Sequence, residues 1–477
     1  MSRTKLWVSG FAIVALLLLF ILTAFAKQLI ISDGSTELLV IDHVTIFDGT
    51  GSVVLKNGVI VVEGDRIRSI GRRGNIRGGK GVTILDASGK FAIPGLIDAH
   101  VHFDQSADIF ARPDAVDLRG IRSYEDEIEW TRNRMPDTLM RYLRAGVTGV
   151  VDMGGPMWTL ALRDSENSST SSPWIAAAGP LLSTVAEPEL DSADPAILLM
   201  ETPDQVQRLV RRIAERKPDL IKVLFIRNRS QELDRQAGLV EVAIAESHRH
   251  GIRVAVHATE LETAKAALEE GADILVHSVD DRRIDSEFLA MLKARNVIYI
   301  PTLLVTERYD QVFSNTVNLT DIERRLGDPD VIRTWGELST IPREKIPGGI
   351  PGAVLLMSRP MEFLNLQILM SADMRIAVGT DAGNIGTPHG PAIHREMELM
   401  VAAGMRPYDV LLAATRVAAE VAGRQKEVGT LQTGKLADIV LLNADPVRDI
   451  RNTQKIFKVM KAGQWVDLGP APASPSK

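Results

Sequence analysis

The sequence contains no cysteine among its 477 residues. A disulfide framework, a thiolate metal site and a lipid-modified N-terminal cysteine are therefore all excluded. Any metal ion would have to be held by nitrogen and oxygen ligands. The chain also lacks a long run of charge of one sign, and its net charge is −6, which argues against nucleic acid as the main partner.

The bulk composition is otherwise that of a folded globular protein. Hydrophobic residues make up 45% of the chain and charged residues 24%, both ordinary values for such proteins. The length suffices for one large domain or two.

One long apolar run stands at the N-terminus, over residues 6–26. Arg3 and Lys5 precede it, and residues 24–26 read Ala-Phe-Ala, the small-x-small pattern of a signal-peptidase site. The run also approaches the roughly 20 residues that span a bilayer. Residues 1–26 are therefore a cleaved signal peptide or a single uncleaved membrane anchor. Both interpretations place the body of the protein outside the cytoplasm, as a periplasmic, secreted or membrane-tethered protein.

Both ends of the body have β-strand patterns. Residues 37–92 hold β-branched segments broken by Asp-Gly, Glu-Gly and Asn-Gly turns, and residues 425–468 return to the same pattern. Because chain termini commonly lie close together, the two blocks predict one small β-sandwich domain. His43 lies within it and is interpreted as structural. The Pro/Ala/Ser tail at residues 469–477 is expected to be disordered.

Between these blocks, over residues 93–424, short apolar segments alternate with helical patterns. Such alternation predicts a parallel sheet, and eight units predict a closed (β/α)8 TIM barrel. An open doubly wound sheet is the alternative, but no Gly-rich nucleotide loop follows the first strand. The segments after the first strand, which ends in His-x-His, are residues 147–153, 174–178, 220–225, 253–257, 274–277, 297–300 and 375–379.

The first barrel strand ends in His100-Val101-His102. Side chains alternate along a strand, so both imidazoles face one side while Val101 faces the other. Two neutral histidines on a rigid edge supply half of a divalent-metal site. Taken alone, the pair is a weak signal for a metal, and two hydrogen-bonded histidines at a strand end are the commoner explanation.

Further ligand types follow at other strand ends: Lys222 in the fourth strand, His257 and His277 ending the fifth and sixth, and Asp381 after the eighth. Each has an ordinary explanation by itself. A lysine can reach the surface along its apolar stem, a buried histidine can be hydrogen bonded, and an aspartate can cap a helix. Their coincidence at the carboxyl ends of barrel strands, where the chemistry of this fold collects, predicts a metal site.

Three motifs carry a resemblance to a known family: PGLIDAHVH at residues 94–102, GTDAG at 379–383 and GKLADIV at 434–440. The chain resembles the amidohydrolase superfamily, in particular its imidazolonepropionase-like and prolidase-like branch, over residues 40–466. The resemblance implies a centre of two divalent metal ions, usually zinc, although manganese or cobalt would suit the same donors.

The resemblance also implies a role for each ligand. One metal would be held by His100, His102 and Asp381, and the other by His257 and His277. Lys222 matches the lysine that is carboxylated by CO2 and bridges the metals, a step that is needed because an ammonium group has no lone pair. Imidazolonepropionases lack this lysine, so it favours the prolidase-like side.

The implied chemistry is hydrolysis. Two metals lower the pKa of a bridging water towards neutrality, and the resulting hydroxide attacks a polarised carbonyl group. Asp381 takes the proton from that water and passes it to the leaving nitrogen. The predicted enzyme cleaves a C–N bond in a small-molecule amide, a dipeptide-like compound or a cyclic amide. An esterase or lactonase at the same centre is one alternative, and a non-catalytic extracytoplasmic binding module that keeps its metals is another. The sequence leaves the oligomeric state open, and a homo-oligomer is one possibility.

Specificity is expected in three long loops, which are lids or surface insertions: residues 104–134, 182–202 and 305–358. His389, within a Pro-His-Gly element, is one candidate substrate contact. Arg227 and Arg229 are two more, because a guanidinium can clamp a carboxylate with two hydrogen bonds. Prolidase-like relatives often carry a tyrosine soon after the bridging lysine, whereas residues 226–231 here read IRNRSQ. This departure argues against a dipeptide with a C-terminal proline.

Overall fold

The computed structural model describes residues 37–72, 81–348 and 359–469. The predicted N-terminal signal peptide or anchor lies outside these residues. So do the tail beyond residue 469, most of the connection expected at 71–81, and part of the hinge expected at 347–352. Within the described ranges, no helix combines the length and hydrophobicity that a membrane crossing requires.

The central region is the predicted barrel, and all eight predicted strands are present. They are β6 (Leu96–Val101), β7 (Val147–Asp152), β8 (Trp174–Ala177), β11 (Ile221–Leu224), β12 (Val254–His257), β13 (Ile274–Val276), β14 (Ile298–Ile300) and β15 (Arg375–Ile376). Their pairings are parallel.

Two short strands that were not predicted follow β8, the third strand of the barrel. β9 (Leu181–Ser183) follows β8 after a break at Gly179, where φ is +73°. β8 pairs with β7 whereas β9 pairs with β11, so the two pieces together bridge the ring. β10 (Ile197–Leu199) pairs with β9. The ring closes between β6 and the residues after β15, where the Ala99 amide donates to the Val378 carbonyl.

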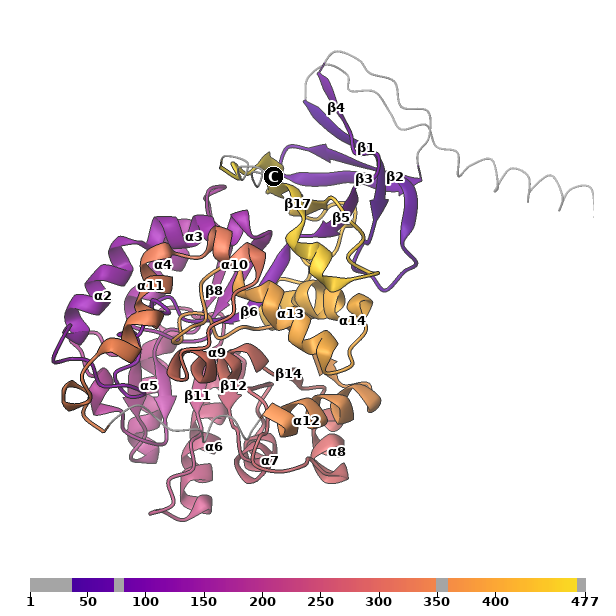
Figure 1. Cartoon of the computed structure of the whole chain (residues 1–477). Helices are drawn as coiled ribbons and strands as arrows, with labels where there is room; N and C mark the ends of the chain where they lie inside the picture. The colour runs from indigo at the N-terminus through magenta and orange to yellow at the C-terminus, as the bar shows by residue number, and fades with distance from the viewer. Residues whose placement is uncertain (1–36, 73–80, 349–358, 470–477) are drawn as a thin grey trace, which may run out of the picture.

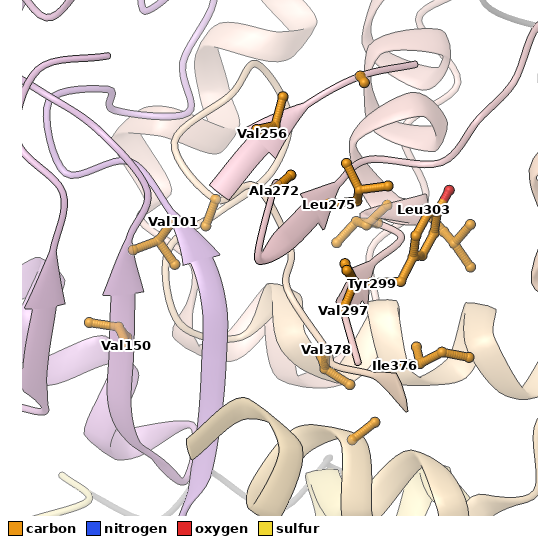
Figure 2. Packing of buried hydrophobic residues seen from close by; sticks show 14 of the residues in the cluster. Val101, Val150, Val256, Ala272, Leu275, Val297, Tyr299, Leu303, Ile376 and Val378 are labelled. Atoms are coloured by element: carbon orange, nitrogen blue, oxygen red, sulfur yellow. The ribbon is translucent and has the colours of Figure 1, made fainter. Parts of the chain in front are cut away.

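Alternation along these strands produces two apolar layers. One layer fills the barrel and the other separates the strands from the helices. The inner layer includes Ala99, Val151, Ala255, Val276 and Ile300. The outer layer includes Val101, Val150, Val256, Leu275 and Tyr299, all labelled in Figure 2. A side chain's layer therefore tells whether it points into the barrel.

Helices surround the strands (Figure 1), and α5, α6, α7 and α8 pack in succession along one side. Sequence signals fix their ends; α5, for example, starts with Pro203 and a capping box between Thr202 and Gln205. The helices are α2 (Tyr124–Asn133), α3 (Met135–Arg144), α4 (Met157–Glu166), α5 (Pro203–Ala214), α6 (Leu233–Arg249), α7 (Leu261–Glu270), α8 (Ser286–Ala294), α9 (Leu303–Phe313), α10 (Asp321–Leu326), α11 (Pro329–Glu337), α12 (Arg359–Ser371), α13 (Ala392–Ala402), α14 (Pro407–Leu412) and α15 (Ala418–Val421).

The strands from the two chain ends form one eight-stranded sheet, which Figure 1 shows in indigo and yellow beside the barrel. It consists of β1 (Leu38–Ile46), β2 (Leu55–Glu63), β3 (Arg66–Arg72), β4 (Val82–Asp86), β5 (Phe91–Pro94), β16 (Ile439–Leu442), β17 (Ile456–Lys461) and β18 (Gln464–Trp465). It encloses its own apolar core, as the β-sandwich prediction required.

The sheet depends on a bend in β1. The first half of β1 pairs with β4 and its end pairs with β5, and the register shifts on either side of Val44. His43 lies at this irregularity with φ of 59°, and its amide donates to the Asp42 carboxylate. These contacts support the structural interpretation of His43.

The first and third long loops pack against each other rather than extending separately into solvent. They share an apolar cluster that includes Ile109, Leu118, Val312 and Trp335, together with Ile385 from the segment after Asp381. The Trp335 indole also donates to the Ala107 carbonyl. The first and third long loops therefore form one packed unit, which contacts the segment after Asp381.

Candidate metal centre

His100 and His102 owe their placement to a bulge in β6. The register between β6 and β7 shifts between Asp98 and Val101, so Ala99 joins the inner layer while Val101 joins the outer one. Bulges often re-aim side chains next to active sites. The two imidazole Nε2 atoms lie 3.1 Å apart, and the Nδ1 atom of His102 lies 2.6 Å from the Gly154 carbonyl oxygen.

Asp381 completes a triangle with these two histidines. Its Oδ1 atom lies 3.2 Å from the Nε2 of His100 and 3.1 Å from the Nε2 of His102. Three ligand atoms on a tetrahedral zinc ion, with bonds of 2.0–2.1 Å, would be separated by roughly 3.3 Å. The triangle thus has nearly the dimensions of one face of a zinc coordination sphere.

His257 and His277 approach the same cluster by different routes. His257 ends β12 by regular alternation, because Ala255 belongs to the inner layer. His277 follows the inner-layer residue Val276, and a left-handed backbone with φ of 74° turns its ring towards the other histidines. The His277 ring lies 4.4 Å from that of His257 and 5.0 Å from that of His100, centroid to centroid. Ligand atoms of His100, His277 and Asp381 all lie within 4.8 Å of one another.

Lys222 points into the barrel, because its neighbours Ile221 and Val223 both belong to the outer layer. Its side chain is 1% exposed, and the amine has no hydrogen-bond partner among the described residues. Burial lowers the pKa of Lys222 to about 7, against the opposing effect of Asp381. An unpartnered amine in such surroundings is costly unless a further group satisfies it.

The protonation of the cluster suits a ligand set. Burial, with the charge of Lys222, lowers the pKa of His100 well below its usual range, and burial lowers that of His277 to about 3. Burial opposes ionisation of Asp381, but His100, His102 and His277 outweigh it and hold that carboxyl pKa well below normal. Burial also lowers the pKa of His102, but its hydrogen bond with Asp381 prevails and raises the net value. Neutral imidazoles and a carboxylate are the forms that bind metal.

The donor set therefore fits a divalent cation. It offers four imidazoles and one carboxylate, of which His257 and His277 are half-buried and the others buried. The amine of Lys222, which has no hydrogen-bond partner among the described residues, lies close enough to His100 and His257 for its charge to lower their pKa. The fold brings together all six residues predicted from the sequence as metal ligands.

His389, Arg227 and Arg229, the three predicted substrate contacts, all form hydrogen bonds with other protein groups. Both ring nitrogens of His389 lie 2.8 Å from protein atoms, Nδ1 from the Tyr142 hydroxyl and Nε2 from the Gln105 carbonyl. Arg227 donates to Gln236 and to two backbone carbonyls in its own loop. Arg229 is an exposed side chain paired with Glu260 and Glu262. These contacts make all three supports of the local structure, and their roles towards substrate stay predictions.

Sequence reasoning missed the residues that hold the ligands. Asp98 accepts hydrogen bonds from the amide and hydroxyl of Thr380 and from the His100 amide, so it joins the two strands that carry ligands. Thr302 contacts His277 through its hydroxyl, at 2.7 Å. Their signal was positional: Asp98 is two residues before His100, and Thr302 is two residues after the end of β14.

A second missed group lies beside Asp381. Asn384 donates to the Asp381 carbonyl, and its side-chain oxygen accepts hydrogen bonds from Arg112 at 2.6 Å and from the Tyr309 hydroxyl at 3.0 Å. Arg112 is also paired with Asp114. These side chains come from the first and third long loops, and the sequence alone gave no reason to bring them together.

Comparison with known proteins agrees with this site. The model of the Amidohydrolase family matches residues 91–466. Imidazolonepropionase of Shouchella clausii (strain KSM-K16) is 25% identical over 462 residues, which cover 87% of this chain and 87% of that protein.

Solved structures share the fold. A Xaa-Pro dipeptidase with methionine bound in its active site superposes with a TM-score of 0.68 and 21% identity, over 90% of this chain and 99% of that one. Phenylurea hydrolase B superposes with a TM-score of 0.69 and 23% identity, over 91% and 97%. The chain therefore belongs to the amidohydrolase family and is a hydrolase of carbon–nitrogen bonds.

Proposed function

We propose that the protein is a metal-dependent amidohydrolase that cleaves the C–N bond of a small-molecule amide, a dipeptide-like compound or a cyclic amide. The observation that carries this proposal is the meeting of six buried or half-buried side chains in one cluster: His100, His102, Lys222, His257, His277 and Asp381. The 3.1–3.2 Å triangle of two imidazole nitrogens and one carboxylate oxygen supports a cation at its centre.

The residues divide between two metal positions. His100, His102 and Asp381 would hold one divalent ion, for which zinc is favoured by the donor types and spacing. His257 and His277 would hold the other. Bound there, the ions would lower the pKa of a water molecule and polarise the substrate carbonyl.

Lys222 is proposed to bridge the two positions as a carbamate. Its neutral amine adds CO2 and releases one proton, which yields an anionic oxygen donor in place of an ammonium that has no lone pair. The lack of a hydrogen-bond partner for this amine among residues 37–72, 81–348 and 359–469 supports the proposal.

The chain's own acid–base group is Asp381. Its carboxylate accepts a proton from the attacking water, and the same oxygen then donates that proton to the nitrogen that leaves. Asp98 and Thr380 hold the backbone just before Asp381, so the carboxylate keeps its orientation through the transfer.

The test is a substrate panel of amides, N-acyl amino acids, dipeptides and matched esters, scored by kcat/KM before and after chelation. The proposal expects amide hydrolysis that disappears on chelation and returns with Zn2+. A higher kcat/KM for the ester of each pair would favour the esterase alternative, and metal binding without turnover on any member would favour the binding module.

We also propose that the protein acts outside the cytoplasm, on the basis of the basic and apolar pattern of residues 1–26. Mass measurement of the chain isolated from its cell envelope distinguishes the two forms. Cleavage gives a first residue of Lys27, whereas an anchor leaves Met1 in place. Recovery of the intact chain in the cytoplasmic fraction alone would contradict both.

A further inference from the structure

Three residues at neighbouring strand ends have left-handed backbones. His277 follows β13 with φ of 74°, Thr302 follows β14 with φ of 46°, and Asp381 follows β15 with φ of 61°. Residues other than glycine seldom adopt this conformation, and a β-branched residue such as threonine is a strong outlier there. His277 and Asp381 belong to the candidate metal centre, so the strain at Thr302 calls for an explanation at the same site.

Thr302 stands where a threonine would ordinarily cap a helix. It immediately precedes α9, but its side chain makes no capping hydrogen bond. The buried carboxyl group of Glu396, from α13, does so instead: it accepts from the amides of Leu303 at 3.0 Å and Leu304 at 2.7 Å. Glu396 thereby releases the hydroxyl of Thr302 for another contact.

That contact is with His277. The Thr302 side chain is 1% exposed, and its Oγ1 atom lies 2.7 Å from the Nδ1 atom of His277. The Ser278 hydroxyl donates to the Pro301 carbonyl, so a second hydrogen bond joins the same two segments. The left-handed conformation at Thr302 thus holds its hydroxyl against one edge of the His277 ring.

We propose that Thr302 is a positioning residue for His277. The Thr302 hydroxyl oxygen accepts a hydrogen bond from the Nδ1–H group of His277, which leaves the Nε2 lone pair of His277 for a metal ion. A metal-bound histidine generally donates its second ring N–H to such a partner, which fixes both the tautomer and the ring orientation. The proposal rests on the metal centre proposed above, and it assigns to the seventh strand, which supplies no ligand, a function in that centre.

Cobalt titration of the full chain, followed by visible absorption, measures the affinity of each metal position. Thr302→Val keeps the β-branched shape and removes only the hydroxyl, and it is expected to weaken one of the two positions by about 10–100-fold. Thr302→Ser keeps the hydroxyl and should stay within about threefold of wild type. Thr263→Val is the matched control, because Thr263 is also buried but its hydroxyl donates to the backbone carbonyl of Glu260, just before α7, and not to a predicted ligand.

Urea unfolding of the metal-free variants separates positioning from plain packing. The proposal expects Thr302→Val and Thr263→Val to lose similar stability, while only Thr302→Val loses cobalt affinity. Equal cobalt affinity in Thr302→Val and wild type would overturn the positioning role and leave the metal centre intact. A wild-type chain that binds no cobalt would overturn both proposals.

Discussion

One carboxylate oxygen of Asp381 lies within 3.2 Å of imidazole nitrogens of His100 and His102, and all three side chains are buried. This placement lets a single side chain act both as a ligand and as a proton carrier. Lys222 is also buried, and its amine has no hydrogen-bond partner within the part of the chain that the structure describes. The two side chains lead to separate predictions.

Asp381→Asn should lower kcat by about 100-fold or more, since an amide cannot accept and return a proton as a carboxylate does. Asn has nearly the same size, so the fold should persist. Steady-state kinetics on an amide substrate provides the measurement, and urea unfolding provides the control for folding. Near-normal turnover in a folded variant would remove Asp381 from the mechanism.

Lys222→Ala should lose one of two metal ions per chain and regain part of its activity when formate, acetate or propionate is added. The added carboxylate would replace the missing oxygen donor. Lys222→Arg is the control, because it keeps the positive charge but cannot form the carbamate, and it should behave like the alanine variant. Elemental analysis gives the metal content, and an unchanged content in Lys222→Ala would contradict the bridging role.

At the scale of elements, the site depends on how closely strand ends approach. Gly379 lies between β15 and Asp381, and a Cβ atom added there would stand 2.7 Å from the Cβ of His100 and 2.6 Å from a methyl group of Ile300. Its position explains why a glycine starts the GTDAG motif.

Gly379→Ala should therefore destabilise the protein by about 1–3 kcal/mol through overpacking and weaken metal binding, because it pushes against the strand that carries His100. Gly238→Ala in α6 is the matched control: a Cβ there meets nothing within 4 Å, and helix propensity predicts a gain of about 0.5–1 kcal/mol. Urea unfolding measures both changes. Equal stability of the two variants would contradict the close approach.

His394 gives a pH dependence at the contact between α13 and its neighbours. Its ring nitrogens lie 2.9 Å from the Thr453 hydroxyl and from the Ala145 carbonyl, and burial lowers the pKa of His394 to about 4. His394 takes up a proton near pH 6.5 in the unfolded chain but only near pH 4 in the folded chain. The free energy of unfolding therefore decreases as the pH is lowered from 6.5 to 4.

Between pH 7 and pH 5 this one histidine should remove about 2 kcal/mol of stability. Urea unfolding at the two pH values measures the loss in the wild type and in His394→Gln, whose side chain stays neutral. The loss should be smaller in the variant by about that amount. An equal loss in both would show that His394 does not set this dependence.

The elements were largely predictable from sequence, whereas their details were not. Short apolar segments such as residues 253–257 and 274–277 coincide with strands β12 and β13, and each segment ends at a predicted ligand. The bulge at His100 and the left-handed backbones of His277 and Thr302 leave no periodic signal. The hydrogen bonds of His389 and Arg227 were also invisible, because they depend on residues that only the fold brings near.

At the scale of the whole molecule, His100 and Asp381 are almost three hundred positions apart in the sequence and yet lie in contact. The closed ring of strands makes this meeting possible, and the packed unit formed by the first and third long loops contacts the segment after Asp381. Buried nitrogen and oxygen lone pairs without a partner are costly, so metal ions that bind them should stabilise the entire fold.

Removal of metal should lower the thermal unfolding midpoint by several degrees, and Zn2+ should restore it. Ligand at 1,000 times its dissociation constant contributes about 4 kcal/mol to the folded state. Differential scanning calorimetry of chelated and reloaded protein makes the comparison, with Mg2+ as a control that these nitrogen donors should not bind well. An unchanged midpoint would argue against occupied metal positions.

The most direct measurement is anomalous diffraction from a crystal of zinc-loaded protein. The account predicts two anomalous peaks about 3.5–4 Å apart, one against His100, His102 and Asp381 and the other against His257 and His277, with density for a carbamate on Lys222 between them. Peaks elsewhere on the molecule, or none at these residues while the same sample hydrolyses an amide, would contradict it.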